Sequence, residues 1–212
     1  GFRLPPASRL GAVAEALVYD VLCQRRLWKR SRSRWFIHAL IFYPFAIRCL
    51  WGLAAWALSH WAPAADATRF FLDKNAPFGA FLFDLTGLAL LAGLILAWRR
   101  GSRADAELAP GLPAQDRTAL GLLLAVTLAG FLLEGLRMAL TGVTDGAAFL
   151  GAFIALPLQG ATWLDQVYGW FWYLHAALWG AVVAYLPFSK LMHVIMAPLV
   201  LALKAARPGH HA

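Results

Sequence analysis

Four long runs of apolar residues, separated by short polar and basic segments, dominate the pattern along the chain. The runs cover about residues 35–60, 78–98, 119–140 and 167–185, and the last one continues past Pro187 towards residue 203. Each run reaches the ~20 residues that an α-helix needs to cross the hydrocarbon core of a bilayer. The runs are continuous and do not alternate as the strands of outer-membrane barrels do. The pattern therefore predicts an all-α, polytopic transmembrane helix bundle with four main spans.

Two shorter segments have a different pattern. Residues 9–30 are amphipathic and basic, which predicts an N-terminal interfacial helix on the membrane surface. Residues 147–158 are apolar but too short to cross a bilayer, so we expect a re-entrant or interfacial piece there. These patterns divide the chain into an interfacial segment at 1–34, a transmembrane bundle at 35–203 and a cytoplasmic tail at 204–212.

The composition supports the membrane prediction. Apolar residues make up 61% of the chain and charged residues 14%, against roughly 45–50% and about 25% in soluble domains. This apolar excess excludes a soluble globule and a disordered chain. The net charge of +8 does not indicate nucleic-acid binding, because the basic residues lie between apolar runs and form no groove or stripe.

The basic residues predict the orientation of the spans. Fifteen fall on one side: Arg3, Arg9, Arg25, Arg26, Lys29, Arg30, Arg32, Arg34, Arg99, Arg100, Arg103, Arg117, Lys190, Lys204 and Arg207. The opposite side carries only Arg69 and Lys74. Because cytoplasmic loops are enriched in Lys and Arg, both termini are predicted to be cytoplasmic.

Four histidines lie in or beside the first and last spans: His38, His60, His175 and His193. An ionisable residue at membrane depth is costly, so each is a functional candidate; the alternative is a hydrogen-bonded packing or interfacial residue. His175 and His193 are 18 residues apart, which places them on one face of a continuous helix, about 27 Å apart along it. His38 is predicted to lie level with His193. Two imidazoles from different helices can hold one haem iron, whereas zinc is disfavoured because no third ligand accompanies the pair.

Three stretches resemble a family of membrane cytochromes b. They are residues 34–42, which contain His38, residues 130–137, and residues 186–193, which end at His193 with His175 upstream. The family includes the gamma subunit of respiratory nitrate reductase and the membrane cytochromes linked to heterodisulfide reductase and sulfite reductase. The resemblance covers about residues 18–198 and is closer to the sulfur-linked branch.

The resemblance implies a haem b subunit that relays electrons between a quinone pool and a cytoplasmic iron–sulfur or molybdenum oxidoreductase. Such a subunit would lie in a bacterial or archaeal cytoplasmic membrane and would not be catalytic alone. By position, His38 and His193 would ligate a cytoplasmic-side haem, and His175 would ligate an outer haem. The basic interfacial segment is expected to help dock the cytoplasmic partner.

The ligand opposite His175 departs from the nitrate reductase pattern. That branch has a histidine ten residues after the first one, and here the position is Arg48, which cannot ligate iron. Three alternatives remain: His60 completes the coordination across a helix bent at Pro44, His175 holds a five-coordinate haem, or the outer haem is absent.

Four charged residues fall inside the predicted spans: Arg48, Asp84, Glu134 and Arg137. Each should have a partner, since a central charge costs roughly 2.5–3.5 kcal/mol on insertion scales. Glu134 and Arg137 are spaced to pair along one helix face. In the alternative interpretation, Arg48 or Arg137 binds a haem propionate, and Glu134 or Asp84 accepts protons from quinol. Cys49 is interpreted as a packing residue.

Two other functional classes compete with the electron relay. A small transporter or channel would use the buried charges to line a path, and a structural anchor would hold no cofactor. Bound haem b distinguishes the relay from both.

Overall fold

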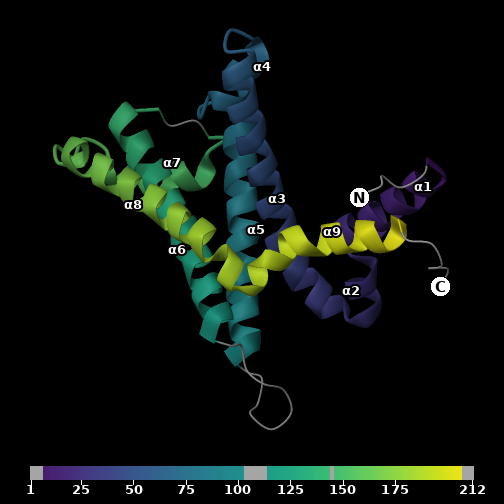
Figure 1. Ribbon diagram of the computed structural model, residues 1–212. Helices are drawn as coiled ribbons and strands as arrows, with labels where there is room; N and C mark the ends of the chain where they lie inside the picture. The colour runs from purple at the N-terminus through teal and green to yellow at the C-terminus, as the bar shows by residue number, and fades with distance from the viewer. Residues whose placement is uncertain (1–6, 103–113, 144–145, 207–212) are drawn as a thin grey trace. The chain divides into compact units, whose positions relative to one another are not determined.

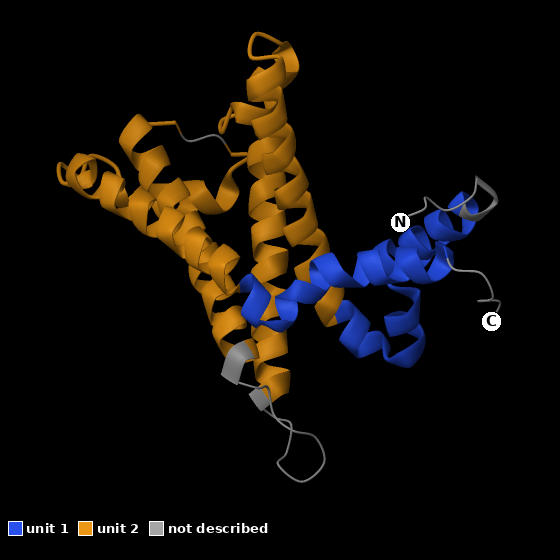
Figure 2. Ribbon diagram, viewed as in Figure 1, with its two compact units in different colours: residues 1–36, 186–212 blue, residues 37–185 orange. Residues whose placement is uncertain are grey.

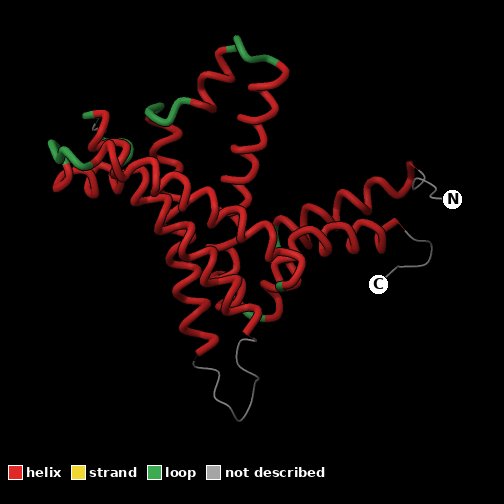
Figure 3. Tube along the Cα trace, turned by 60° about the vertical axis from the view of Figure 1, so that its left-hand side comes forward, coloured by secondary structure: helices red, strands yellow, loops and turns green. Residues whose placement is uncertain are grey.

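The computed structural model describes residues 7–102, 114–143 and 146–206, and this part of the chain is helical apart from turns, with no strand (Figure 3). Four of its helices are long and apolar enough to cross a membrane (Figure 1). They are α3 (Arg32–Trp61), α5 (Pro77–Ser102), α6 (Ala114–Thr141) and α8 (Leu164–Tyr185). The predicted all-α transmembrane fold is confirmed. Three basic residues used in the orientation argument, Arg3, Arg103 and Arg207, lie outside the described residues.

The chain forms two compact units (Figure 2). The first unit contains residues 1–36 and 186–212, and the second contains residues 37–185. The division of the chain at residues 34 and 203, suggested by the sequence, stays a prediction.

The last predicted span ends earlier than its apolar run. After α8 come three short elements: the 3₁₀ turns η3 (Leu186–Phe188) and η4 (Lys190–Met192), and the helix α9 (His193–Ala206). Pro187 has no backbone N–H to continue the helical ladder. Ser189 is extended, with φ −125° and ψ 168°, and its hydroxyl oxygen accepts the Leu191 N–H at 3.2 Å. The expectation that His175 and His193 share one continuous helix is therefore wrong.

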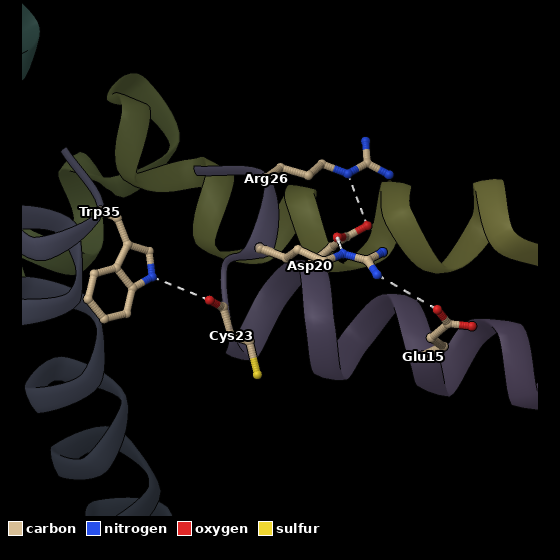
Figure 4. Close-up of polar contacts among 6 residues, drawn as sticks. Glu15, Asp20, Cys23, Arg26 and Trp35 are labelled. Carbon is tan, nitrogen blue, oxygen red and sulfur yellow. Dashed lines mark hydrogen bonds and ion pairs between the residues drawn. The ribbon is translucent and has the colours of Figure 1, made fainter. Parts of the chain in front are cut away.

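In the first unit, the N-terminal helices pack against the C-terminal helix α9. The N-terminal elements are α1 (Ala7–Glu15), the π-helix η1 (Ala16–Leu22) and α2 (Arg25–Arg30). The predicted single helix over residues 9–30 is interrupted at Gln24, whose φ of 52° is left-handed. The Asp20 side chain is only 4% exposed and accepts hydrogen bonds from Arg25 Nε at 3.2 Å and Arg26 Nε at 2.9 Å (Figure 4). Two arginines of α2 thus bind the carboxylate of Asp20 across the interruption at Gln24.

The interruption is also tied to the start of α3. The indole N–H of Trp35 donates to the Cys23 carbonyl at 3.3 Å (Figure 4). The Trp35 ring meets the Trp28 ring edge to face, with centroids 4.7 Å apart. The Arg32 guanidinium lies 5.3 Å from the centre of the Trp28 ring. These contacts connect the basic segment to the first residues of the span.

In the second unit, a short helix packs beside α6. The segment predicted to be re-entrant or interfacial forms α7 (Phe149–Ala155) and the 3₁₀ turn η2 (Leu156–Leu158); its depth in the membrane stays a prediction. The core of this unit lies where α5, α6, α7 and α8 meet, and it contains Ala80, Leu136, Met138, Ala139, Ala148, Ala155 and Leu164. A further short helix, α4 (Asp66–Leu72), lies between α3 and α5.

Glycines set the spacing between α6 and α7. A Cβ atom on Gly135 would lie 2.6 Å from Ile154 Cβ and 3.4 Å from the Gly151 carbonyl oxygen. A Cβ atom on Gly151 would lie 2.8 Å from both Glu134 Cγ and Met138 Sδ. Small residues allow helix backbones in membranes to approach closely and gain packing energy. The position of α7 therefore depends on both glycines.

We predict that Gly135→Val destabilises the protein, because its side chain must displace Ile154. Overpacking of this kind costs about 1–3 kcal/mol, so the thermal unfolding midpoint in detergent should fall. Gly180→Ala in α8 is the control, since no described heavy atom lies within 4 Å of its Cβ position. Equal midpoints for the two variants would contradict the packing argument.

Candidate cofactor cavity

The second unit contains a cavity of about 560 Å³ bordered by α3, α5, α6, α8 and the segment before α5. Sites for small molecules and cofactors typically measure ~300–1,000 Å³ and are mostly apolar with a few polar groups. Aromatic side chains form much of the wall, including Phe45, Trp51, Phe83, Phe131, Trp172 and Trp179. Charged side chains on the wall include Arg48, Lys74, Glu134 and Arg137. The cavity therefore suits a large, flat, apolar group with anionic substituents.

His175 enters the cavity from α8 and meets α6 at a glycine. A Cβ atom on Gly130 would lie 3.2 Å from His175 Cε1, 3.9 Å from Nδ1 and 4.0 Å from Nε2. Because Gly130 has no side chain, the imidazole lies against the backbone of α6. The His175 Nδ1 atom is buried and has no hydrogen-bond partner among the described residues. A buried ring nitrogen without a partner is costly, so this atom has the capacity for one further interaction.

Arg48 reaches the same cavity from α3 and is fixed to α5. Its Nε donates to Thr86 Oγ1 at 3.1 Å, and its Nη2 donates to the Phe83 carbonyl. The guanidinium also lies 4.9 Å from the centre of the Phe83 ring. A Cβ atom on Gly87 would lie 2.6 Å from Arg48 Nη2, so this glycine provides the room that the guanidinium needs. The buried arginine has the partners that the sequence analysis required.

Asp84 connects α5 to α7. It is 0% exposed, and its Oδ2 accepts the Leu150 N–H at 2.6 Å and a further hydrogen bond from the Gly151 backbone. Both N–H groups belong to the first turn of α7, where backbone donors have no partner within the helix. The Glu134 side chain of α6 lies against the same turn, since a Cβ atom on Gly151 would lie 2.8 Å from Glu134 Cγ. Asp84 therefore fixes the start of α7 to α5.

Arg137 does not pair with Glu134 as the i, i+3 spacing suggested. Its Nη1 donates to Asn75 Oδ1 at 2.7 Å, and no ion pair joins the two residues among the described contacts. Asn75 lies in the turn before α5, where its own N–H donates to Asp73 Oδ1 at 2.8 Å. The expected pairing of Glu134 with Arg137 along α6 is wrong. The Arg137 guanidinium instead binds the side-chain amide of Asn75.

The other candidate histidines are not among the residues that line this cavity. His60 is five residues beyond Ala55, the last α3 residue on the cavity wall, and its Nδ1 donates to the Trp56 carbonyl at 2.9 Å. His38 belongs to the second unit and stacks on Phe42, with ring centroids 5.9 Å apart. His193 belongs to the first unit, where its Nδ1 donates to the Lys190 carbonyl. The pairing of His38 with His193 stays a prediction.

Two features of the cavity were not anticipated from the sequence. Cys49, interpreted as a packing residue, is half-buried and lies on the cavity wall. Lys74, counted only as a topology signal, lies on the wall as well, with its Nζ 5.4 Å from the centre of the Phe83 ring. The sequence held no signal for either residue, because adjacent helix residues such as Arg48 and Cys49 do not share a helix face.

Comparison with known proteins gives several relatives. A subunit of the dihydromethanophenazine:CoB–CoM heterodisulfide reductase of Methanosarcina acetivorans is 32% identical over 197 residues, which cover 89% of this chain and 65% of the relative. The corresponding subunit from Methanosarcina thermophila is 28% identical over 203 residues with the same coverage. The Hdr-like menaquinol oxidoreductase cytochrome b-like subunit of Archaeoglobus fulgidus is 34% identical over 141 residues, 59% of this chain and 41% of the relative.

This chain spans 65% of the length of the heterodisulfide reductase subunits named above. No solved structure matches it. The family described as nitrate reductase gamma subunit matches residues 33–206, which include all four long helices from the second residue of α3 onward. The chain therefore belongs to the nitrate reductase gamma subunit family, as its motifs predicted.

Proposed function

We propose that the chain is a haem b membrane subunit that relays electrons between the quinone pool and a cytoplasmic iron–sulfur or molybdenum oxidoreductase. The observation that carries the proposal is the contact of His175 with Gly130 in an aromatic cavity inside a transmembrane bundle. A relative is named as a cytochrome b-like subunit of a menaquinol oxidoreductase, which agrees with this chemistry.

The residues around His175 fit a haem. Because Nδ1 is unpaired, the imidazole has no structural hydrogen bond there to give up. The aromatic wall suits the porphyrin faces, and Arg48, Lys74 and Arg137 supply positive charge for the propionates. When bound, haem b supplies reversible one-electron transfer at its iron.

The iron at this site is proposed to be five-coordinate. Arg48 cannot ligate iron, and His60 is not among the residues of the cavity wall. Of the three alternatives that the sequence left open, a haem held from one side by His175 agrees best with this arrangement.

A second haem is proposed between His38 and His193. A carbonyl oxygen can only accept, so His193 Nδ1 is the donor in the contact with Lys190. Haem- and metal-binding histidines commonly use this arrangement, in which the second ring nitrogen donates to a carbonyl and orients the ring. His193 is thus prepared as a ligand by its own turn of the chain.

The partner and the membrane orientation follow from the same proposal. Both termini are placed in the cytoplasm, where the basic segment around α2 contacts the partner subunit and the phospholipid headgroups. Alone, the chain passes electrons but has no terminal substrate.

The transporter and structural-anchor alternatives gain no support from the buried charges. Arg48, Asp84 and Arg137 are each held by hydrogen bonds to a neighbouring element. A continuous ion path needs groups that exchange partners, whereas these groups fix helix positions.

We predict that His38→Ala and His193→Ala each remove the same low-spin b-type haem, because either change deletes one of its axial ligands. His175→Ala should remove the other haem. Pyridine haemochrome quantification and low-temperature spectra of the purified variants measure both effects. His60→Ala is the control, since His60 is not on the cavity wall and the proposed five-coordinate site gives it no ligand role, so the haem count should be unchanged. Absence of haem b from the wild-type chain under haem-sufficient expression would refute the relay.

We also predict that Gly130→Leu weakens haem binding at His175, because the new side chain occupies the space of the imidazole. Loss of support for a ligating histidine typically costs about 10–100-fold in affinity. Gly121→Leu on the same helix is the control, since its Cβ would meet only Trp98, at 4.0 Å. Haem retention after extended washing in detergent separates the two variants. Equal retention would contradict the proposed place of the haem.

A further inference from the structure

The exposed side of α9 is apolar. The helix packs against α1 and η1 within the first unit, yet none of its residues is buried. Its large exposed apolar side chains recur at helical spacing, so they lie along one side of the helix. They are Ile195, Met196, Leu199, Val200 and Leu203, and each is between 39% and 52% exposed. Water would cover this set, the α9 stripe, if the unit lay in the aqueous phase.

α9 is too short to cross the bilayer. Its 14 residues extend about 21 Å at 1.5 Å per residue, whereas the hydrocarbon core is about 30 Å thick. The turns η3 and η4 also separate it from the span α8. An apolar helix of this length belongs to a protein core or to a membrane interface. The exposure of the α9 stripe favours the interface, where a helix satisfies its own backbone groups.

The same unit carries a large excess of positive charge. Residues 1–36 and 186–212 contain eleven Lys and Arg but only two acidic residues, Glu15 and Asp20. Both acidic groups contact Arg25, at 3.9 Å and 3.2 Å. The other basic residues of α2 are exposed, and they are Arg26, Lys29 and Arg30. Each basic group close to an anionic membrane surface strengthens the attraction to it.

The unit is attached to membrane spans at two points. The chain enters it from α8 at Leu186 and leaves it along α3, which begins at Arg32. The contact between the Trp28 and Trp35 rings lies at the second junction, and tryptophan is enriched where membrane and water meet. Asp20 of η1 binds α2 (Figure 4), and η1 packs against α9. The stripe and the charges thus belong to one module that the spans hold beside the bilayer.

We propose that the first unit binds the surface of a bilayer that contains anionic phospholipid, with α9 lying in the plane of the interface. The α9 stripe enters the boundary of the acyl chains, and the exposed basic side chains of α2 bind headgroup phosphates. This combination of an apolar helix side and basic groups is typical of interfacial helices. The inference goes beyond the proposed electron relay and holds whether or not the chain binds haem.

The composition of the α9 stripe favours lipid over a protein partner. The residues that dominate binding in protein–protein interfaces are Trp, Tyr and Arg, whereas Leu and Val are under-represented among them. The stripe contains only aliphatic side chains and methionine. It therefore offers no directional group to a protein but suits fluid acyl chains.

The first test measures the surroundings of the α9 stripe in the full chain. Leu199→Cys, made in a Cys23→Ala/Cys49→Ala background, carries a nitroxide label, and the protein is reconstituted in vesicles of phosphatidylcholine and phosphatidylglycerol. Oxygen concentrates in lipid, whereas a nickel–EDDA complex stays in water. Labels on Leu53→Cys, at a site 61% exposed on the span α3, and on Asp66→Cys, at a fully exposed site on α4, are the lipid and water references.

We expect the label at residue 199 to respond to oxygen as the label at residue 53 does. A nickel response like that at residue 66 would place the stripe in water and overturn the proposal. A weak response to both reagents would mean that protein covers the stripe, and this would overturn the proposal as well. Ile195→Cys in the same stripe decides the result if the label at residue 199 disturbs folding.

The second test concerns the basic groups. Arg30→Gln removes an exposed charge from the last turn of α2. The preference of the chain for phosphatidylglycerol over phosphatidylcholine should fall by about five-fold, the effect of one basic group at an anionic surface. Arg69→Gln is the matched control, since it removes an exposed arginine from α4, outside the unit. Native mass spectrometry of the bound lipids measures both variants. An unchanged preference in Arg30→Gln, or an equal loss in the two variants, overturns the assignment of the headgroup contact to this unit.

Discussion

A polar group inside a lipid-covered helix bundle must find its partner within the protein, because no water is present to replace it. This constraint determines the second compact unit. The guanidinium of Arg48 is bound by a threonine hydroxyl and a carbonyl of α5, and the carboxyl of Asp84 is bound by the first N–H groups of α7. Each of these bonds joins two helices. Arg48, which lines the cavity, and Asp84 are therefore also the links that hold neighbouring helices in place.

Three glycines complement these links. Gly87 lies against Arg48, Gly130 against His175, and Gly151 against the side chain of Glu134. The glycines come from α5, α6 and α7, and each gives space to a side chain of a different helix. In membrane proteins, small residues usually serve close backbone packing. Here they also leave room for the polar side chains around the cavity.

The sequence was sufficient for the fold and for part of the site. Continuous apolar runs predict the four long helices, because crossing a bilayer demands about 20 apolar residues in succession. The motifs with His38, His175 and His193 also predicted the family that the comparison found. The end of α8 was missed because residues 186–192 are as apolar as the helix before them, while Pro187 and the Ser189 cap decide the local backbone. Apolarity measures burial in lipid and carries no information about such a break.

The hydrogen bonds that join the helices of the second unit could not be predicted from the sequence, for a different reason. Asp84 and Leu150 are 66 residues apart, and Arg137 and Asn75 are 62 residues apart. No helical period relates such positions, so only the packing of α5, α6 and α7 brings them together. The spacing of Glu134 and Arg137 suggested a local pair, and this failed because the tertiary partner Asn75 was invisible. Local periodicity identifies which residues need partners but does not identify the partners.

The turn that precedes α9 determines the direction of the imidazole ring of His193, the proposed haem ligand. The His193 ring is oriented by the carbonyl of Lys190, three residues earlier, within a turn begun by Ser189. The groups that form this contact lie within five consecutive residues of the chain, 189–193. Because the contact is local, it depends on the backbone of this turn and not on residues that are distant in the sequence.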